Sequence, residues 1–355
     1  HQIYMATDEN AHPGAVFRLQ YCYIHDGTGG NNVKSRAERN EIYFNWIEGA
    51  RYHELELIGP DQSPWDPRGE LPPREDSDVV GNVIRTTQST SWCSVRVGGD
   101  GTGGTAGRYR FVNNTFLFPG SMTGAVFRHF MKLESIEMHN NVLYAVGGGA
   151  VRVALQQGFD EQGDEQEADP FTWSTGKKLI AGSNNWISST MTAVPTEWQN
   201  TLKGSDPGFS DLAALDLSPK AGSPLVDAGI AKTFSPQGYD FPKPLALPTH
   251  MPPAHALIAV GSAEARGINE GGVDVGAFER PGKPAPAPDG GTTGSDGGSS
   301  GDDSGPSASD GGAVGGDSGR RQISDGCALQ SGQGAPAGLL LLGIALLLAA
   351  ARRRR

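Results

Sequence analysis

The sequence predicts an all-β chain wound as a right-handed parallel β-helix, followed by a disordered linker and a C-terminal transmembrane helix. Three observations lead to this prediction. A short strand pattern recurs around one column of asparagines, turn-rich insertions separate the recurrences, and an apolar run closes the chain after a Gly-, Ser- and Asp-rich stretch. In a solenoid each coil buries its apolar face only against its neighbours, so a pattern that recurs in this way predicts stacked coils.

The recurring pattern is aligned on one reference position in six segments. The reference residues are Cys22, Asn45, Asn82, Asn114, Asn141 and Asn185. The residue two positions later is apolar in all six: Ile24, Ile47, Ile84, Phe116, Leu143 and Ile187. The residue three positions earlier is apolar in five: Leu19, Ile42, Val79, Phe111, Met138 and, as the exception, Gly182. Apolar and charged residues alternate before the reference position, and this period of two indicates strands.

Asparagine at the reference position predicts a sharp bend between two short strands. Asparagine tolerates the left-handed backbone region, and its amide can bond the chain in the next coil. We therefore expect an asparagine ladder along the solenoid. The recurrences are 23 to 44 residues apart, so we expect the longer coils to carry loops, such as 63–75 and 98–107. Such insertions gather on one face of a solenoid, which is often the binding face.

The chain divides into three parts by composition. Residues 1–280 form the predicted β-helix domain, and we expect further N-terminal coils and a signal peptide upstream, because His1 follows no such segment. Residues 281–325 are almost wholly small and polar and predict a disordered linker. Residues 326–355 contain a 17-residue apolar run, 335–351, which is just long enough to cross a bilayer, and four terminal arginines that favour the cytoplasmic side.

The C-terminal thirty residues resemble the sorting segments of myxobacterial surface proteins, in which a Gly-Cys pair precedes an apolar span and an arginine cluster. Gly326 and Cys327 form that pair here. The resemblance implies export and anchoring at the cell surface or outer membrane, so the membrane becomes a partner. It also makes Cys327 a candidate point of processing or lipidation.

The charge balance constrains the ligand. The chain carries a net charge of −11, and all of it belongs to the predicted β-helix, with 33 acids against 22 bases before residue 281. An acidic body argues against nucleic acid as a partner. A uronate polysaccharide would therefore need a local basic groove. No CxxC or other metal-binding spacing is present, so the metal ligands stay unknown.

The segment from Asn31 to Leu57 holds the best candidate for a catalytic residue. Lys34-Ser35 and the later Leu55-x-Leu57 resemble the catalytic coil of β-helical polysaccharide lyases of the chondroitinase B and alginate lyase type. In that family a lysine followed by serine acts as the Brønsted base. Here Ile58 stands where the family has an arginine, and glycines stand near the places of the family's calcium-binding carboxylates.

The wider chain looks like the pectin-lyase-like group of bacterial right-handed β-helix proteins. The phrase N-x-x-K-S-R-A from Asn31 and the closing phrases 221–229 and 274–279 are similar to phrases in that group. The resemblance implies polysaccharide degradation and a monomer, and it makes Ca²⁺ a candidate cofactor.

Polysaccharide β-elimination needs a base and a cation that stabilises the negative charge of the intermediate. We assign Lys34 as the base, Arg51 or Arg36 as the group that neutralises the substrate carboxylate, and His53 as the proton donor to the leaving sugar. The alternatives are plain: an outward lysine on a solenoid is usually a solvated charge, and Arg36 can pair with a neighbouring glutamate.

Four further residues are candidates for substrate binding: Glu54, Glu56, His25 and Trp46. The two glutamates alternate with leucines, so a solvated strand face explains them equally well. His25 fits a turn after a strand. Trp46 could stack on a sugar ring if it points outward, or pack against a loop.

Two hypotheses of different class remain open. The first is a surface-anchored enzyme that cleaves an acidic, uronate-containing polysaccharide by β-elimination, or by hydrolysis through a carboxylate pair among Asp26, Glu48, Glu54 and Glu56. The second is a non-catalytic β-helix that binds glycans or builds the cell envelope. The enzyme hypothesis requires Lys34, Arg51 and His53 to converge on one groove.

Overall fold

The structure is a computed structural model that describes residues 1–9, 11–60, 74–100, 105–130, 133–159, 165–168, 179–257, 259–268 and 271–281. These residues contain strands β1 to β22, and no helix occurs among them. The all-β prediction is therefore confirmed for this part of the chain.

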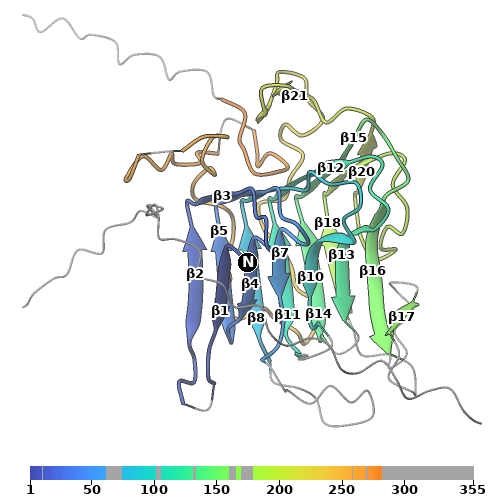
Figure 1. Ribbon diagram of the computed structural model, residues 1–355. Coiled ribbons are helices and arrows are strands. Elements are labelled where there is room, and N and C mark those ends of the chain that lie inside the picture. Colours follow the sequence, from blue (N-terminus) through green and yellow to red (C-terminus); the bar gives the residue numbers. More distant parts are fainter. Residues whose placement is uncertain are drawn as a thin grey trace, which may run out of the picture.

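Three sheets contain almost all of the strands, and each sheet is built from equivalent strands of successive coils (Figure 1). Sheet A contains β1 (Ile3–Ala6), β4 (Val33–Arg36), β7 (Leu55–Leu57), β10 (Cys93–Val97), β13 (Ala125–Phe130), β16 (Arg152–Phe159) and β17 (Glu165–Ala168). Sheet B contains β2 (Val16–Gln20), β5 (Arg39–Tyr43), β8 (Asp76–Val80), β11 (Arg108–Val112), β14 (Ser135–His139) and β18 (Leu179–Ser183). Sheet C contains β3 (Tyr23–His25), β6 (Trp46–Glu48), β9 (Val83–Arg85), β12 (Thr115–Pro119), β15 (Val142–Val146), β19 (Trp186–Ser188) and β20 (Leu202–Gly204).

The chain visits sheets B, C and A in turn, as in β2–β3–β4 and β5–β6–β7, before it starts the next coil. Within the three sheets the coil-to-coil pairings are parallel, and only β17 joins its sheet antiparallel. A separate antiparallel pair, β21 (Phe209–Asp211) and β22 (Asp216–Pro219), follows the last coil. Parallel sheets stacked in register are consistent with the predicted parallel β-helix.

The asparagine ladder lies at the corner between sheets B and C, and the prediction of it is confirmed. Asn82 Nδ2 donates to Asn114 Oδ1 at 3.0 Å, and Asn114 Nδ2 donates to Asn141 Oδ1 at 3.0 Å. The backbone N–H of each of these residues donates to the same oxygen of the next rung, as in Asn114 N to Asn141 Oδ1 at 2.9 Å. Each rung therefore satisfies the polar backbone of a buried bend.

The left-handed bend itself lies one residue before the predicted position. The residues that precede the rungs all have positive φ: Tyr21 (56°), Phe44 (55°), Gly81 (70°), Asn113 (52°), Asn140 (56°) and Asn184 (53°). The bend falls there because the rung itself immediately precedes the sheet C strand and must present its N–H and side chain to the next coil.

The apolar columns fill the interior between the sheets. The column two residues after the rungs is buried in all six coils, from Ile24 (8% exposed) to Ile187 (0%). The column before the rungs is in register across sheet B, where Ile42 pairs with Val79, and Val79 with Phe111. The interior is one contiguous core that runs the length of the solenoid.

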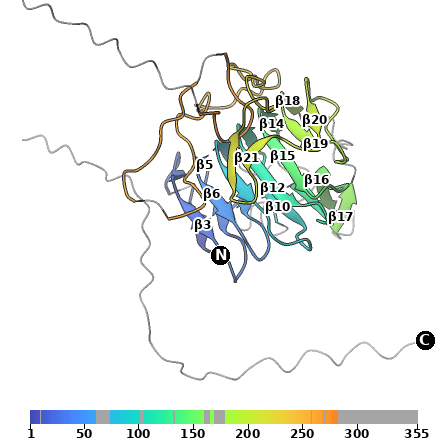
Figure 2. The same cartoon turned by 90° about the horizontal axis from the view of Figure 1, so that it is seen from above.

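The described residues from 206 to 280 include a segment that covers the outer face of sheet C and forms a second core there. Figures 1 and 2 both place β21 over this sheet. Trp46, Val142 and Trp186 point outward from sheet C and pack against Leu225 and Val275 of the covering segment. Both closing phrases of the sequence thus belong to this cover.

The cover is held by a second, outer row of asparagines at the left-handed positions. Asn113 Nδ2 donates to Asp274 O at 2.8 Å, Asn140 Nδ2 to Ile230 O at 3.0 Å, and Asn184 Nδ2 to Ala228 O at 2.7 Å. These residues therefore both make the bend and bind the backbone that packs on it.

The predicted linker and transmembrane helix fall on residues 282–355, outside the described residues, and the middle parts of both predicted loops also lie outside them. No helix capable of crossing a bilayer is found where the structure describes the chain. Both predictions about the C-terminal segment stay predictions.

We expect Asn114→Ala to lower the free energy of unfolding by about 1–3 kcal/mol, because the buried groups that face this rung lose their partners. Urea denaturation followed by circular dichroism measures the change. Thr196→Ala, at an exposed threonine that bonds only its neighbour Glu197, is the control. Equal stability of the two variants would contradict a supporting role for the ladder.

Candidate functional site

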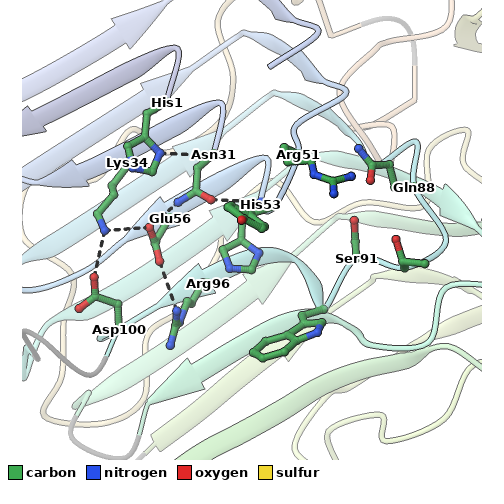
Figure 3. A pocket seen from close by; sticks show the side chains of 13 residues that line it. His1, Asn31, Lys34, Arg51, His53, Glu56, Gln88, Ser91, Arg96 and Asp100 are labelled. Atoms are coloured by element: carbon green, nitrogen blue, oxygen red, sulfur yellow. Dashed lines mark hydrogen bonds and ion pairs between the residues drawn. The ribbon is translucent and has the colours of Figure 1, made fainter. Parts of the chain in front are cut away.

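A cavity of about 530 Å³ opens on the outer face of sheet A, beside the turns that lead from sheet C (Figure 3). It is lined by His1, Asn31, Lys34, Arg51, Tyr52, His53, Glu56, Gln88, Thr90, Ser91, Trp92, Arg96 and Asp100. These residues come from the segments around β1, β4, β7 and β10, so four successive strands of sheet A contribute to one groove.

Strand alternation places a charged row on the floor of the groove. Val33, Leu55 and Val95 are in register and lie in the core. The residues that follow them point to the opposite face, since successive side chains alternate along a strand. This outward row runs, in register, through Tyr4, Lys34, Glu56, Arg96 and Arg128.

Ion pairs join the row into one network. Lys34 Nζ lies 3.3 Å from Glu56 Oε2 and 2.9 Å from Asp100 Oδ2, and the lysine side chain is 12% exposed. Arg96 Nη1 lies 3.5 Å from Glu56 Oε1. Lys34 is thus an ammonium group between two carboxylates, and Glu56 lies between two cations.

Asn31 connects this network to His53. Its Nδ2 donates to Glu56 Oε2, and its Oδ1 accepts the backbone N–H of His53 at 3.2 Å. Asn31 is 3% exposed, so its amide is fixed on both sides. One buried asparagine therefore sets the positions of an acid and an imidazole on the groove wall.

His53 is a neutral imidazole at neutral pH in this environment. The ring is buried, and burial lowers the pKa of His53 to about 4, an effect that nearby Glu56 only partly opposes. Its Nδ1 lies 3.3 Å from both the carbonyl oxygen and the sulfur of Cys93. Burial also raises the pKa of the Cys93 thiol to about 12, so this cysteine is not a nucleophile at neutral pH.

The three residues required to converge do so: Lys34, Arg51 and His53 all line the cavity, and Glu56 lines it with them. Arg36 does not. Its guanidinium lies behind Asp100, at 2.5 Å from Oδ2, and it also donates to Gly59 O and to the hydroxyl of Tyr4. Arg36 therefore holds Asp100 in place instead of facing the groove.

Glu54 lies inside the corner between sheets C and A rather than in the groove. It is 1% exposed and accepts bonds from Asn32 Nδ2 at 2.7 Å and from the backbone N–H of Ala50. Burial raises the pKa of Glu54 to about 8. The solvated strand face considered for this residue is therefore not observed.

His25 and Trp46 belong to the outer side of sheet C, away from the groove. His25 stacks on Tyr23 with ring centroids 4.3 Å apart and pairs with Asp26 at 2.9 Å. Trp46 is fully buried under the covering segment, and its Nε1 donates to Glu48 Oε2 at 2.9 Å. Packing, the alternative considered for Trp46, is what the structure shows.

The carboxylates considered for hydrolysis do not gather in the groove. Glu48 accepts bonds from Trp46, Tyr23, Arg85 and His255 on sheet C. Burial alone would raise its pKa, but these bonds outweigh burial and lower it. Of the four candidate acids only Glu56 lines the groove.

Several groove residues escaped the sequence analysis, above all Arg96, Asp100 and Trp92. Arg96 lies 40 residues after Glu56 and faces it across one strand pair. Extending the strand alignment from the ladder through the third strand of each coil would have found Arg96. No comparable sequence pattern marks Asp100 or Trp92, which follow from loop placement.

Among the described residues no group of three or more His, Cys, Asp or Glu side chains could hold a metal ion, so calcium stays an untested candidate. No family model, curated protein or solved structure matches this chain.

The buried neutral state of His53 predicts that this residue destabilises the fold in acid. Between pH 6.5 and about 4 the unfolded chain binds a proton at this ring and the folded chain does not, so stability falls as the pH falls through this window. His53→Gln should remove up to about 3 kcal/mol of this loss. Urea denaturation at pH 7 and pH 4.5 measures it, with the exposed His12→Gln as the control. Identical pH dependence in the two variants would rule out the neutral buried ring.

Proposed function

We propose that the groove on sheet A binds an acidic polysaccharide and that Lys34 cleaves it by β-elimination. The observation that carries this proposal is the convergence of Lys34, Arg51 and His53 on one cavity, together with Arg96. The fold of a parallel β-helix, in its right-handed pectin-lyase-like form, supports the same substrate class by resemblance.

Local charge supports an anionic ligand. The protein as a whole is acidic, yet Lys34, Arg51 and Arg96 line a single cavity, and its described lining residues include two carboxylates, Glu56 and Asp100. A cleft with a local excess of cations concentrates anions even on an acidic molecule. A uronate carboxylate that enters can exchange with Glu56 or Asp100 as the partner of these cations.

Exposed aromatic rings support a sugar. Tyr52 and Trp92 line the cavity, and each is 61% exposed. Tyr4, which is 49% exposed, lies beside Lys34 with the ammonium 5.5 Å from its ring centroid. Large exposed aromatic side chains that gather around a groove indicate a binding surface. The apolar C–H face of a sugar ring suits such a surface.

The proposed reaction transfers two protons, breaks a C–H bond and a C–O bond, and forms one C=C bond. Lys34, once neutral, takes the proton next to the uronate carboxylate, and Arg51 or Arg96 stabilises the charge that develops there. The electron pair of the C–H bond forms the new C=C bond while the C–O bond to the leaving sugar breaks. The leaving oxygen then takes a proton from water, because the buried His53 ring is neutral and carries no acidic proton to give. Lys34 can take this proton only when its ion pairs with Glu56 and Asp100 have opened.

The second candidate is a non-catalytic glycan-binding protein. The two carboxylates around Lys34 Nζ favour it, because ion pairs with Glu56 and Asp100 are a structural role that explains the lysine without catalysis. Export and anchoring through the C-terminal segment belong to both candidates, and the sequence of that segment supports them. We propose a monomer that acts at the cell surface or outer membrane.

Lys34→Ala should reduce turnover by roughly 100-fold or more if Lys34 is the base, since general bases contribute on this scale. The measurement is the ultraviolet absorbance of the unsaturated uronate formed from alginate, pectate and chondroitin sulfate, with and without calcium. Lys203→Ala, at an exposed lysine of β20, is the matched control and should keep full turnover.

Calorimetric binding of the same polymers separates the two candidates. Binding by the wild type without any absorbance change would reject the lyase and leave the glycan-binding protein. Turnover that survives in Lys34→Ala would reject Lys34 as the base.

A further inference from the structure

We propose that Trp92 is a stacking platform for a pyranose ring of the polysaccharide and that Arg128 fixes this platform from below. The inference rests on the proposed binding function of the groove. It adds a binding residue and a positioning residue that the sequence analysis did not select.

Exposure distinguishes Trp92 from the other tryptophans that the structure describes. Trp92 is 61% exposed and lines the cavity, whereas Trp46, Trp186 and Trp198 are 0%, 1% and 7% exposed. An exposed indole keeps a large apolar surface in water, so covering it with an apolar face is favourable.

The backbone of Trp92 is held against the next coil. Its carbonyl oxygen accepts the N–H of Ala125 at 3.0 Å, and Ser89 O accepts the N–H of Thr123 at 3.2 Å. A Cβ on Gly124 would lie 1.9 Å from Trp92 O, so only glycine permits this close approach. The indole therefore projects from a fixed turn.

Arg128 fixes the ring itself. Its guanidinium carbon lies 5.1 Å from the Trp92 ring centroid, within the range of a cation–π contact. Arg128 is only 5% exposed, and it is the neighbour of Arg96 in the outward row of sheet A. The buried guanidinium supports one side of the ring. A ring placed in this way loses little freedom on binding, which favours affinity.

The platform and the cations face the same cavity. A uronate residue can place its carboxylate among Lys34, Arg51 and Arg96 while the C–H face of a sugar ring covers Trp92. A polyanion without sugar rings can use the cations alone. The geometry thus points to an acidic polysaccharide and not to an acidic peptide.

The test compares two polyanions by isothermal titration calorimetry: an oligouronate cut from pectate, alginate or chondroitin sulfate, and poly-L-glutamate. Trp92→Ala should weaken oligouronate binding roughly tenfold and leave polyglutamate binding unchanged. Lys34→Ala should weaken both. Leu257→Ala, at an apolar side chain that is 83% exposed and outside the groove, is the control and should change neither.

Arg128→Met tests the positioning role, because methionine keeps the apolar stem and removes the charge. It should weaken oligouronate binding in the wild-type background but not further in Trp92→Ala, since it acts through the indole. Thermal denaturation of each variant confirms that it is folded.

The outcomes separate the two proposals. Oligouronate binding that needs Lys34 but is unchanged in Trp92→Ala overturns the platform and leaves the groove as an anion site. If Arg128→Met weakens oligouronate binding as much in the Trp92→Ala background as in the wild type, the two effects are additive and the positioning role is overturned. A wild type that binds none of the oligouronates overturns both the proposed function and the platform.

Discussion

The in-register stacking of coils is the constraint on which the rest of the structure depends. Neighbouring strands in a sheet lie about 4.8 Å apart, so equivalent residues of successive coils become close neighbours whatever their separation in sequence. The ladder from Asn45 to Asn185 maintains this register at one corner, because each rung bonds the next. Lys34, Glu56 and Arg96 are adjacent for that reason alone.

The outer faces of sheets A and B carry similar charged rows, but only the row on sheet B is buried by the covering segment. On sheet B the row includes Glu41, Asp78, Arg110 and Glu137 in register. The covering segment buries this row, and Arg110 donates to the carbonyl oxygens of Leu245 and Ala246. Burial raises the pKa of Glu137 to about 7. The row on sheet A keeps an open cavity, so coverage and not composition separates a structural row from a candidate site.

The sequence predicted the repeating part of the fold well because repetition is a local signal. Each rung and each inward column could be read from residues within five positions of one another. The cover could not be predicted in this way, since its contacts join segments far apart, as between Asn113 and Asp274. Trp46 and Trp92 show the consequence. Trp46, which fitted the repeat, is buried by the cover. Trp92, which lies outside the repeat, is exposed in the groove.

The candidate site was predicted where its residues lay within one short stretch of sequence and missed where they came from distant parts of the chain. Lys34, Arg51 and His53 were found together because all belong to one short stretch. Arg96 required the register of the third sheet, and Arg36 was misplaced because outward direction at a strand end does not guarantee access. Asp100 covers Arg36 from a turn that the strand pattern does not describe.

The network of opposite charges in the groove limits what charge alone can contribute to binding. Glu56 and Asp100 already neutralise the ammonium of Lys34, so a ligand carboxylate must replace an existing partner and gains only the difference between the two pairings. Both sides of that exchange are carboxylate–cation pairs of the same chemical kind. Selectivity for a sugar must therefore come from contacts that Glu56 and Asp100 cannot make, and the exposed rings of Tyr52 and Trp92 supply surface of that kind.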